Sequence, residues 1–248
     1  MFDTALLTLT WRVTRKRFLG SPPALAAALA FPAFVAWIGL QDSYGTAARI
    51  FYFILPHAFL LAAQDTVRTD IESGVLENAL FSGGRFRGFL MAKGLVAAAV
   101  AGAYVLFLSG LFAAWGMAIG AFRASDLVRI GLALIAGLYY VALAGILSHF
   151  LRGGSNVLAL LLAQAAVLVT LLFTVSARTG LLDHAASGRF PGLGPKLLFG
   201  GLALILPNVI VTGRPTLFAA GVLAGLLAAL LIRTWLLRRL ELGWRRGS

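Results

Sequence analysis

The chain has 248 residues, of which 60% are hydrophobic and only 12% are charged, and its mean hydropathy is +0.91. This composition excludes an ordinary soluble domain and predicts a protein embedded in a bilayer. The net charge is +12 and no cysteine is present, so a disulfide framework and a thiolate metal site are both excluded.

The first 20 residues predict an amphipathic helix that lies on the membrane surface. Phe2, Leu6, Leu9 and Val13 recur at helical spacing, while the basic residues lie elsewhere on the helix wheel. The sequence Gly20-Ser21-Pro22-Pro23 then predicts a turn into the first apolar run.

Six apolar runs are long enough to cross the bilayer as helices. The hydrocarbon core is about 30 Å thick and a helix rises about 1.5 Å per residue, so about 18 apolar residues are needed. The runs lack the alternation of a barrel strand, so we expect every span to be helical. The six runs are residues 18–41, 46–64, 94–122, 130–151, 153–177 and 215–232.

The positions of the cations predict the orientation of the chain. With six spans and both termini in the cytoplasm, two thirds of the 21 Lys and Arg residues lie on the cytoplasmic side, as the positive-inside rule requires. We therefore expect one all-α, multi-pass domain over residues 1–248 in a bacterial inner membrane. Because the cations flank the spans, nucleic-acid binding is disfavoured.

A seventh apolar run, residues 197–213, is nearly long enough to cross. A crossing there would leave fewer cations inside than outside, and Pro207 and Asn208 interrupt the run. We expect a re-entrant or interfacial hairpin within an outer segment, 179–214, with its broken backbone covered by protein. The last segment, 215–248, combines the final span with a basic tail. Its cations Arg233, Arg238, Arg239, Arg245 and Arg246, with Trp235 and Trp244, predict an interfacial anchor.

The segment between the second and third spans is the polar part of the chain. Residues 65–93 contain four of the nine acidic residues, and 66–92 form a predicted cytoplasmic region. Residues 69–81 predict a short amphipathic helix, and Ser82-Gly83-Gly84 ends it. Its apolar stripe is Ile71, Val75, Leu76, Ala79 and Leu80, and its polar residues are Asp70, Glu72, Glu77 and Asn78.

At these residues the sequence resembles the membrane subunits of ATP-binding-cassette (ABC) exporters of the second permease type. The resemblance rests on the order Glu72, Gly74, Leu76, Glu77 and Leu80, then a break, then Arg85 and Lys93-Gly94, and on the layout of nearly the whole chain. The family usually has a proline in the break, where this chain has Gly83-Gly84. One alternative stays open, since a charged loop between two spans is often simply solvated.

The resemblance implies a coupling helix at residues 69–81 that docks on a separate ABC ATPase subunit. It implies a dimer with a second permease copy or a paralogue, and ATP-driven export of a lipophilic or amphipathic substrate by alternating access. ATP and Mg would bind to the ATPase, and no cofactor would bind to this chain. The implied partner-binding residues are Asp70, Glu72, Gly74, Leu76, Glu77, Leu80 and Arg85.

The chain is not expected to be an enzyme. No Gly-x-x-x-x-Gly-Lys-Ser/Thr phosphate loop is present, so it cannot hydrolyse ATP alone. Every acidic residue falls in a predicted loop or helix end, which disfavours an ion-coupled carrier.

His57 follows Pro56 in the middle of the second span and is a candidate for the substrate path, together with Phe53, Tyr139 and Tyr140. A lone intramembrane histidine is more often hydrogen-bonded to a neighbouring helix. Two alternatives to the ABC exporter remain. One is a haem exporter B-like subunit of a cytochrome c maturation complex, and the other is an ATP-independent carrier or membrane anchor.

Overall fold

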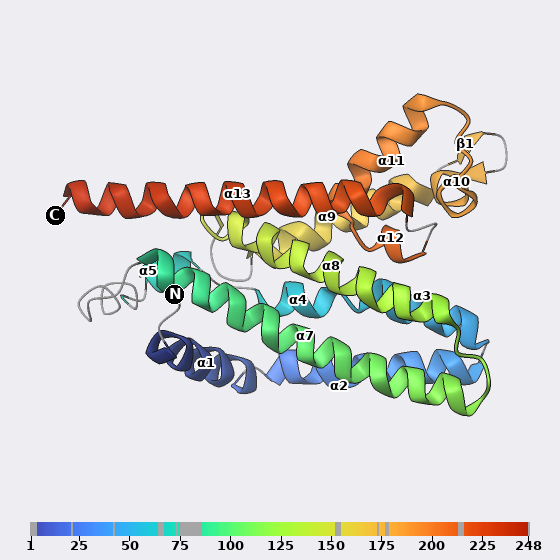
Figure 1. Cartoon of the computed structure of the whole chain (residues 1–248), viewed down its shortest axis with the longest axis horizontal. Coiled ribbons are helices and arrows are strands. Elements are labelled where there is room, and N and C mark those ends of the chain that lie inside the picture. Colours follow the sequence, from blue (N-terminus) through green and yellow to red (C-terminus); the bar gives the residue numbers. More distant parts are fainter. Residues whose placement is uncertain are drawn as a thin grey trace.

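The computed structural model describes residues 4–20, 22–41, 43–63, 67–72, 74, 86–151, 155–172, 174–176, 179–212 and 216–247. Within these residues the protein is an elongated helical bundle, in which the long helices run roughly along one axis (Figure 1). The helices are α1 (Thr4–Leu19), α2 (Pro22–Gln41), α3 (Tyr44–Ile54), α4 (His57–Ala62), α5 (Arg68–Glu72), α7 (Phe86–Ala118), α8 (Ala124–Leu147), α9 (Ser155–Leu172), α10 (Leu181–Ser187), α11 (Leu193–Ile205), α12 (Val209–Thr212) and α13 (Thr216–Gly247). The strands β1 (Thr174–Ser176) and β2 (Thr179–Gly180) pair in antiparallel fashion.

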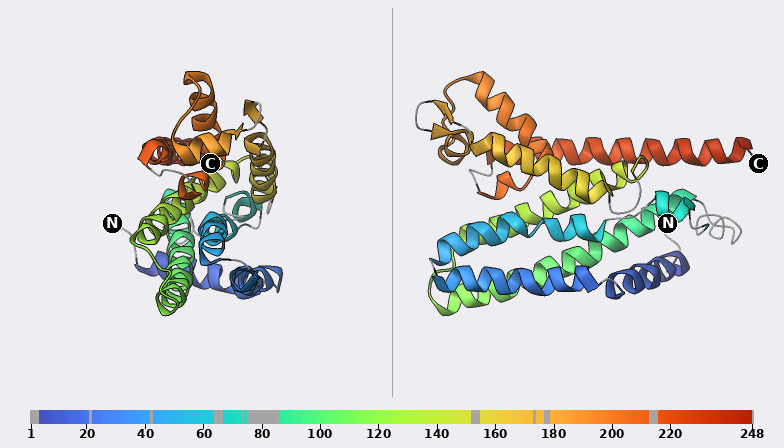
Figure 2. Two further views of the ribbon diagram at one scale, coloured as in Figure 1. Left: turned by 90° about the vertical axis from the view of Figure 1, so that its right-hand side faces the viewer. Right: turned by 180° about the vertical axis from the view of Figure 1, so that it is seen from behind.

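The bundle has two distinct ends. Helices α1 and α5 and the C-terminal turns of α13 lie at one end, which we call the α5 end (Figures 1 and 2). The α7–α8 connection, the β1–β2 pair and α10 lie at the other, which we call the α10 end. The chain passes between the two ends several times, as a multi-pass membrane protein requires.

Four helical segments among the described residues are long and apolar enough to cross a membrane: Tyr44–Ala62, Gly88–Ala118, Ala124–Leu147 and Ala219–Arg239. They coincide with four of the six predicted spans and confirm the helical, multi-pass class. The predicted spans 18–41 and 153–177 coincide with α2 and α9, whose apolar parts are the shorter segments Ala28–Gln41 and Ser155–Thr170. Six spans therefore stay a prediction.

Several helices differ in length from the apolar runs predicted as spans. The helix expected over 153–177 ends at Leu172, because β1 follows it with the β-branched pair Thr174-Val175. Helix α7 begins at Phe86, so it extends beyond the N-terminal end of the run 94–122 and includes Lys93. Helix α13 continues to Gly247, so the predicted last span and most of the basic tail are one helix.

Helix α1 confirms the helix predicted within residues 1–20, and it packs against α7. Its Thr10 side chain is buried and donates to the Leu7 carbonyl oxygen, whereas Leu9 and Trp11 are exposed. A location at the membrane surface stays a prediction.

The main core lies where α3, α4, α7, α8 and α13 pack together. At the crossing of α4 and α8, a Cβ atom on Gly137 would overlap the ring of Phe59, which is 1% exposed. Small residues at helix crossings in membranes let two backbones approach closely, so Gly137 sets the spacing of this pair.

At the α10 end, a buried carboxylate organises the turn between α7 and α8. Asp126 accepts from the Arg123 backbone N–H at 3.1 Å and pairs with Arg129 at 2.9 Å. The Tyr44 hydroxyl donates to the same carboxylate at 3.4 Å. The start of α8 is thereby joined to the start of α3.

The Gly137 crossing predicts a loss of stability in Gly137→Ala. The added methyl group collides with Phe59, and over-packing of this kind costs about 1 to 3 kcal/mol. Gly131→Ala is the matched control, since it lies on the same helix and its Cβ would meet nothing within 4 Å. Thermal unfolding of the two purified variants measures the difference. Equal unfolding temperatures would contradict a close α4–α8 approach.

Candidate functional site

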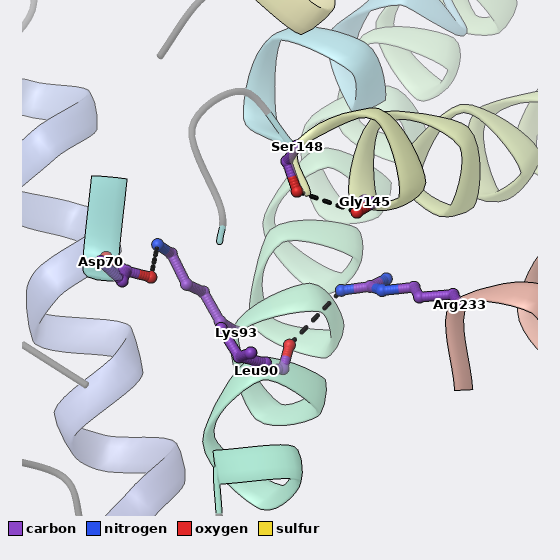
Figure 3. Close-up of polar contacts among 6 residues, drawn as sticks. All are labelled: Asp70, Leu90, Lys93, Gly145, Ser148 and Arg233. Atoms are coloured by element: carbon purple, nitrogen blue, oxygen red, sulfur yellow. Dashed lines mark hydrogen bonds and ion pairs between the residues drawn. The ribbon is translucent and has the colours of Figure 1, made fainter. Parts of the chain in front are cut away.

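The polar segment before α7 is attached to the bundle by a buried ion pair. Asp70, on α5, is 0% exposed, and its carboxylate accepts a hydrogen bond from the ammonium group of Lys93 on α7. Figure 3 shows the Lys93 side chain extending from α7 to Asp70. Because both groups are buried, each compensates the charge of the other. The pair therefore holds α5 against the first turns of α7.

The predicted coupling residues differ in where the structure places them. Asp70 faces inward, so its position argues against direct contact with another polypeptide and gives it a positioning role. Glu72 is exposed on the same short helix. Gly74 has φ +67°, a left-handed conformation that favours glycine and ends the helix. The continuous helix predicted over 69–81 is therefore wrong at Gly74. Leu76, Glu77, Leu80 and Arg85 lie outside the described residues.

A second buried cation lies on the other side of α7. Arg233 of α13 is 8% exposed, and its NH2 group donates to the Leu90 carbonyl oxygen at 3.4 Å. Figure 3 shows the guanidinium reaching α7 from the side opposite Asp70. Arg233 belongs to the predicted interfacial anchor, but it is buried, because the α13 helix turns this residue toward α7 and α8 while Arg238 and Arg239 face outward.

Next to Arg233, the turn after α8 holds His149. Its Nδ1 atom lies 2.8 Å from the Gly145 carbonyl oxygen.

Two broken helices meet in the interior of the bundle. Leu55 and Pro56 separate α3 from α4, and Leu206, Pro207 and Asn208 separate α11 from α12. Residues 206–211 are all buried, so the broken backbone of the predicted hairpin is covered by protein. Asn208 donates its side-chain amide to the Phe53 carbonyl oxygen at 2.6 Å. Asn208, in the break between α11 and α12, thus supplies a hydrogen-bond donor for a carbonyl group beside the break between α3 and α4.

His57 completes this polar cluster. Its Nδ1 atom lies 2.9 Å from the Ile54 carbonyl oxygen and 3.1 Å from Asn208 Nδ2. Its Nε2 atom lies 3.1 Å from Gln164 Oε1 on α9. The Ala58 amide donates to Leu55 instead of Ile54, which leaves the Ile54 carbonyl for the imidazole. Histidine therefore connects three segments of the chain: α3–α4, α9 and the α11–α12 hairpin.

His57 also lines an apolar pocket of about 310 Å³ between α2, α4 and α7. Among the described lining residues the other polar side chain is that of Tyr104, whose hydroxyl donates to the Ala28 carbonyl oxygen at 2.5 Å. A mostly apolar pocket with one or two placed polar groups is the usual form of a small-molecule site. This arrangement suits an apolar ligand, because both His57 ring nitrogens and the Tyr104 hydroxyl already have partners within the protein.

The other predicted path residues do not line this pocket. Tyr140 is 0% exposed within the main core, with its ring centroid 5.6 Å from that of His57. Tyr139 is buried beside Gly225 of α13. Phe53 packs against a second core cluster under α11. The structure therefore places His57 at the pocket, Tyr139 and Tyr140 in the packed interior, and Phe53 half-buried against the second cluster.

Gln164, Asn208 and Arg233 are the residues that sequence reasoning missed as parts of a site. A signal existed for Asn208, because it follows Pro207 inside an apolar run. Gln164 was detectable as an amide near the middle of the predicted span 153–177. Arg233 gave no signal, because a cation next to the end of an apolar run looks like a flanking residue.

The chain matches no protein-family model, no curated protein and no solved structure. The geometry of the described residues therefore carries the functional argument.

The Asp70–Lys93 pair predicts that Asp70→Asn is strongly destabilising. The change removes the carboxylate that pairs with a buried ammonium group, and breaking a buried pair in this way costs about 3 to 5 kcal/mol. Glu72→Gln is the control, because it removes the same charge from an exposed position two residues away on α5. Chemical unfolding of both variants in detergent measures the costs. The double variant Asp70→Asn, Lys93→Met removes both charges and is expected to recover most of the loss; no recovery would contradict the pairing.

Proposed function

We propose that the chain is the membrane-spanning permease subunit of an ABC exporter and that a separate ATPase subunit drives it. The observation that carries this proposal is the buried Asp70–Lys93 pair. It joins the polar segment between α4 and α7 to the base of a long helix. A partner that pulled on this segment would therefore move α7 directly.

The length of α7 supports transmission of such a movement. The helix has 33 residues, and at about 1.5 Å per residue it extends about 50 Å. A displacement applied at the α5 end would reach the α10 end as a rigid-body motion, the kind of switch that hinge and shear transitions use. The exposed Glu72 lies where a partner could hold α5.

The arrangement of the other elements supports six crossings. Helices α2 and α9 run along the bundle with the four longer apolar segments (Figure 2). The α11–α12 hairpin occupies the α10 end before α13 begins. In the proposed topology the α5 end faces the cytoplasm of a bacterium, and both termini lie there. Two permease subunits and two ATPase subunits would form the transporter.

The pocket beside His57 supports a lipophilic or amphipathic substrate, because its described lining is apolar apart from His57 and Tyr104. ATP and Mg would bind to the partner ATPase. The haem exporter B alternative gains no support from His57, since both ring nitrogens lie within hydrogen-bond distance of protein atoms. An ion-coupled carrier is not favoured either. Asp70 and Asp126, the buried carboxylates of the described residues, lie at the two ends of the bundle and are both paired with cations.

Partner binding at α5 predicts that Glu72→Arg abolishes association with the ATPase encoded beside this chain. The charge reversal changes the exposed side of α5 and leaves the buried Asp70–Lys93 pair in place. Asp183→Arg is the control, because it makes the same charge change at an exposed position of α10. Co-purification from membranes measures the association. Normal assembly of Glu72→Arg, or equal loss in both variants, would contradict docking at α5.

The proposed topology predicts opposite accessibility of the two ends. The chain has no cysteine, so a single cysteine can be introduced without first replacing native cysteines. Glu72→Cys is expected to resist a membrane-impermeant maleimide in intact spheroplasts and to react after lysis. Ser187→Cys, exposed on α10, is expected to react in both conditions. Labelling of Glu72→Cys in intact spheroplasts would place the α5 end outside and overturn the proposed function.

A further inference from the structure

Arg233 is a charged group whose compensation is incomplete. A guanidinium carries five N–H donors and prefers an anion as its partner. Within the described residues Arg233 makes one hydrogen bond, the long contact to Leu90, and no ion pair, and its buried Nε atom has no partner. Burying a charge in this way is costly unless an opposite charge approaches it.

The neighbouring helices leave space for this side chain. A Cβ atom on Gly94 of α7 would lie 2.6 Å from Arg233 NH2, and one on Gly145 of α8 would lie 2.8 Å from Arg233 Cζ. Any larger residue at either position would displace the guanidinium. Two glycines on two helices therefore accommodate the cation, so its inward position is built into the packing of α7, α8 and α13.

Arg233 lies in the wall of an apolar groove of about 240 Å³ between α7, α8 and α13. Leu95, Leu138 and Leu230, one from each helix, line the groove and are 47%, 42% and 44% exposed. The groove therefore opens to the outside of the bundle. In a membrane protein this surface is in contact with lipid.

Arg233 and the apolar part of the groove lie at different depths in the membrane. Arg233 lies six residues before Arg239, where the apolar segment of α13 ends, which corresponds to about 9 Å of helix. From there the groove extends toward the middle of the bundle, to Leu138 and Leu226. A cation close to the α5 end with an apolar channel running inward matches the shape of a phospholipid, whose phosphate lies at the boundary and whose acyl chains lie deeper.

We propose that this groove binds one anionic phospholipid, with its phosphate paired to Arg233 and one acyl chain along the leucine-lined wall. The preference for an anionic headgroup follows from the surroundings. Among the described residues no carboxylate pairs with Arg233, so nothing there would receive the ammonium group of a zwitterionic lipid. Arg238 and Arg239 are exposed on the following turn and add positive charge at the same end. This inference does not depend on an ATPase partner.

The experiment uses the full chain in nanodiscs of phosphatidylcholine that contain a trace of phosphatidylglycerol with a diazirine on one acyl chain. Photolysis followed by peptide mass spectrometry locates the labelled helices. We expect labels on α7, α8 and α13 near the groove. Unlabelled phosphatidylglycerol is expected to compete at least fivefold better than unlabelled phosphatidylcholine. Equal competition by the two lipids would overturn the proposal, and this measurement needs only the unmodified protein.

Two variants and a control test the residues. Arg233→Gln is expected to reduce groove labelling at least fivefold and to abolish the headgroup preference. Leu230→Trp fills the groove from a half-exposed position, and it is expected to reduce labelling while Arg233 remains. Arg238→Gln removes the same charge from the exposed face and is expected to change labelling less than twofold. Unchanged labelling in Arg233→Gln would overturn the proposal. So would loss of self-association in Arg233→Gln with labelling intact, because a second copy of the chain would then occupy the groove.

Discussion

The structure depends on the rule that a polar backbone group inside a bilayer must find a partner within the protein. Two proline-containing breaks, one between α3 and α4 and one between α11 and α12, free carbonyl groups in the interior. The hydrogen bond from Asn208 to the Phe53 carbonyl oxygen brings the two breaks together. The Ile54 carbonyl oxygen of the first break lies within hydrogen-bond distance of His57. Each break would be costly alone. Together with Gln164 they form one cluster, and this cluster sets the position of the hairpin and of the pocket beside it.

Helix α7 is the second organising element, because a buried cation lies on each of two sides of it. Its own Lys93 is paired with Asp70 on one side, and Arg233 of α13 approaches on the other (Figure 3). The first contact is a complete ion pair, whereas the second lacks an anion within the described residues. The physical contrast assigns them different roles. The Asp70–Lys93 pair is a mechanical link between α5 and α7, and Arg233 is the proposed binding group for a lipid phosphate.

Sequence reasoning succeeded where the cause is local. Hydrophobic length predicted Tyr44–Ala62 and three other spanning segments, because a helix must bury about 18 apolar residues to cross. Pro207 predicted the break in the hairpin, because proline lacks a backbone donor. Gly74 was assigned to a continuous helix, and its left-handed conformation was missed because glycine is compatible with both structures. His57 was identified as polar and deep, and its partner Gln164 was not, because these residues are 107 positions apart.

Hydrophobic length and the chemistry of proline and glycine are properties of the sequence, and they are enough to predict a helical membrane protein and the places where its helices are interrupted. Which interruptions meet and which cations are buried depends on how the helices pack. Lys93 and Arg233 both look like flanking residues along the chain, yet their partners are 23 and 143 positions away. The pairing of such groups depends on how α5, α7 and α13 cross, and the crossings are set by packing around small residues such as Gly94 and Gly145.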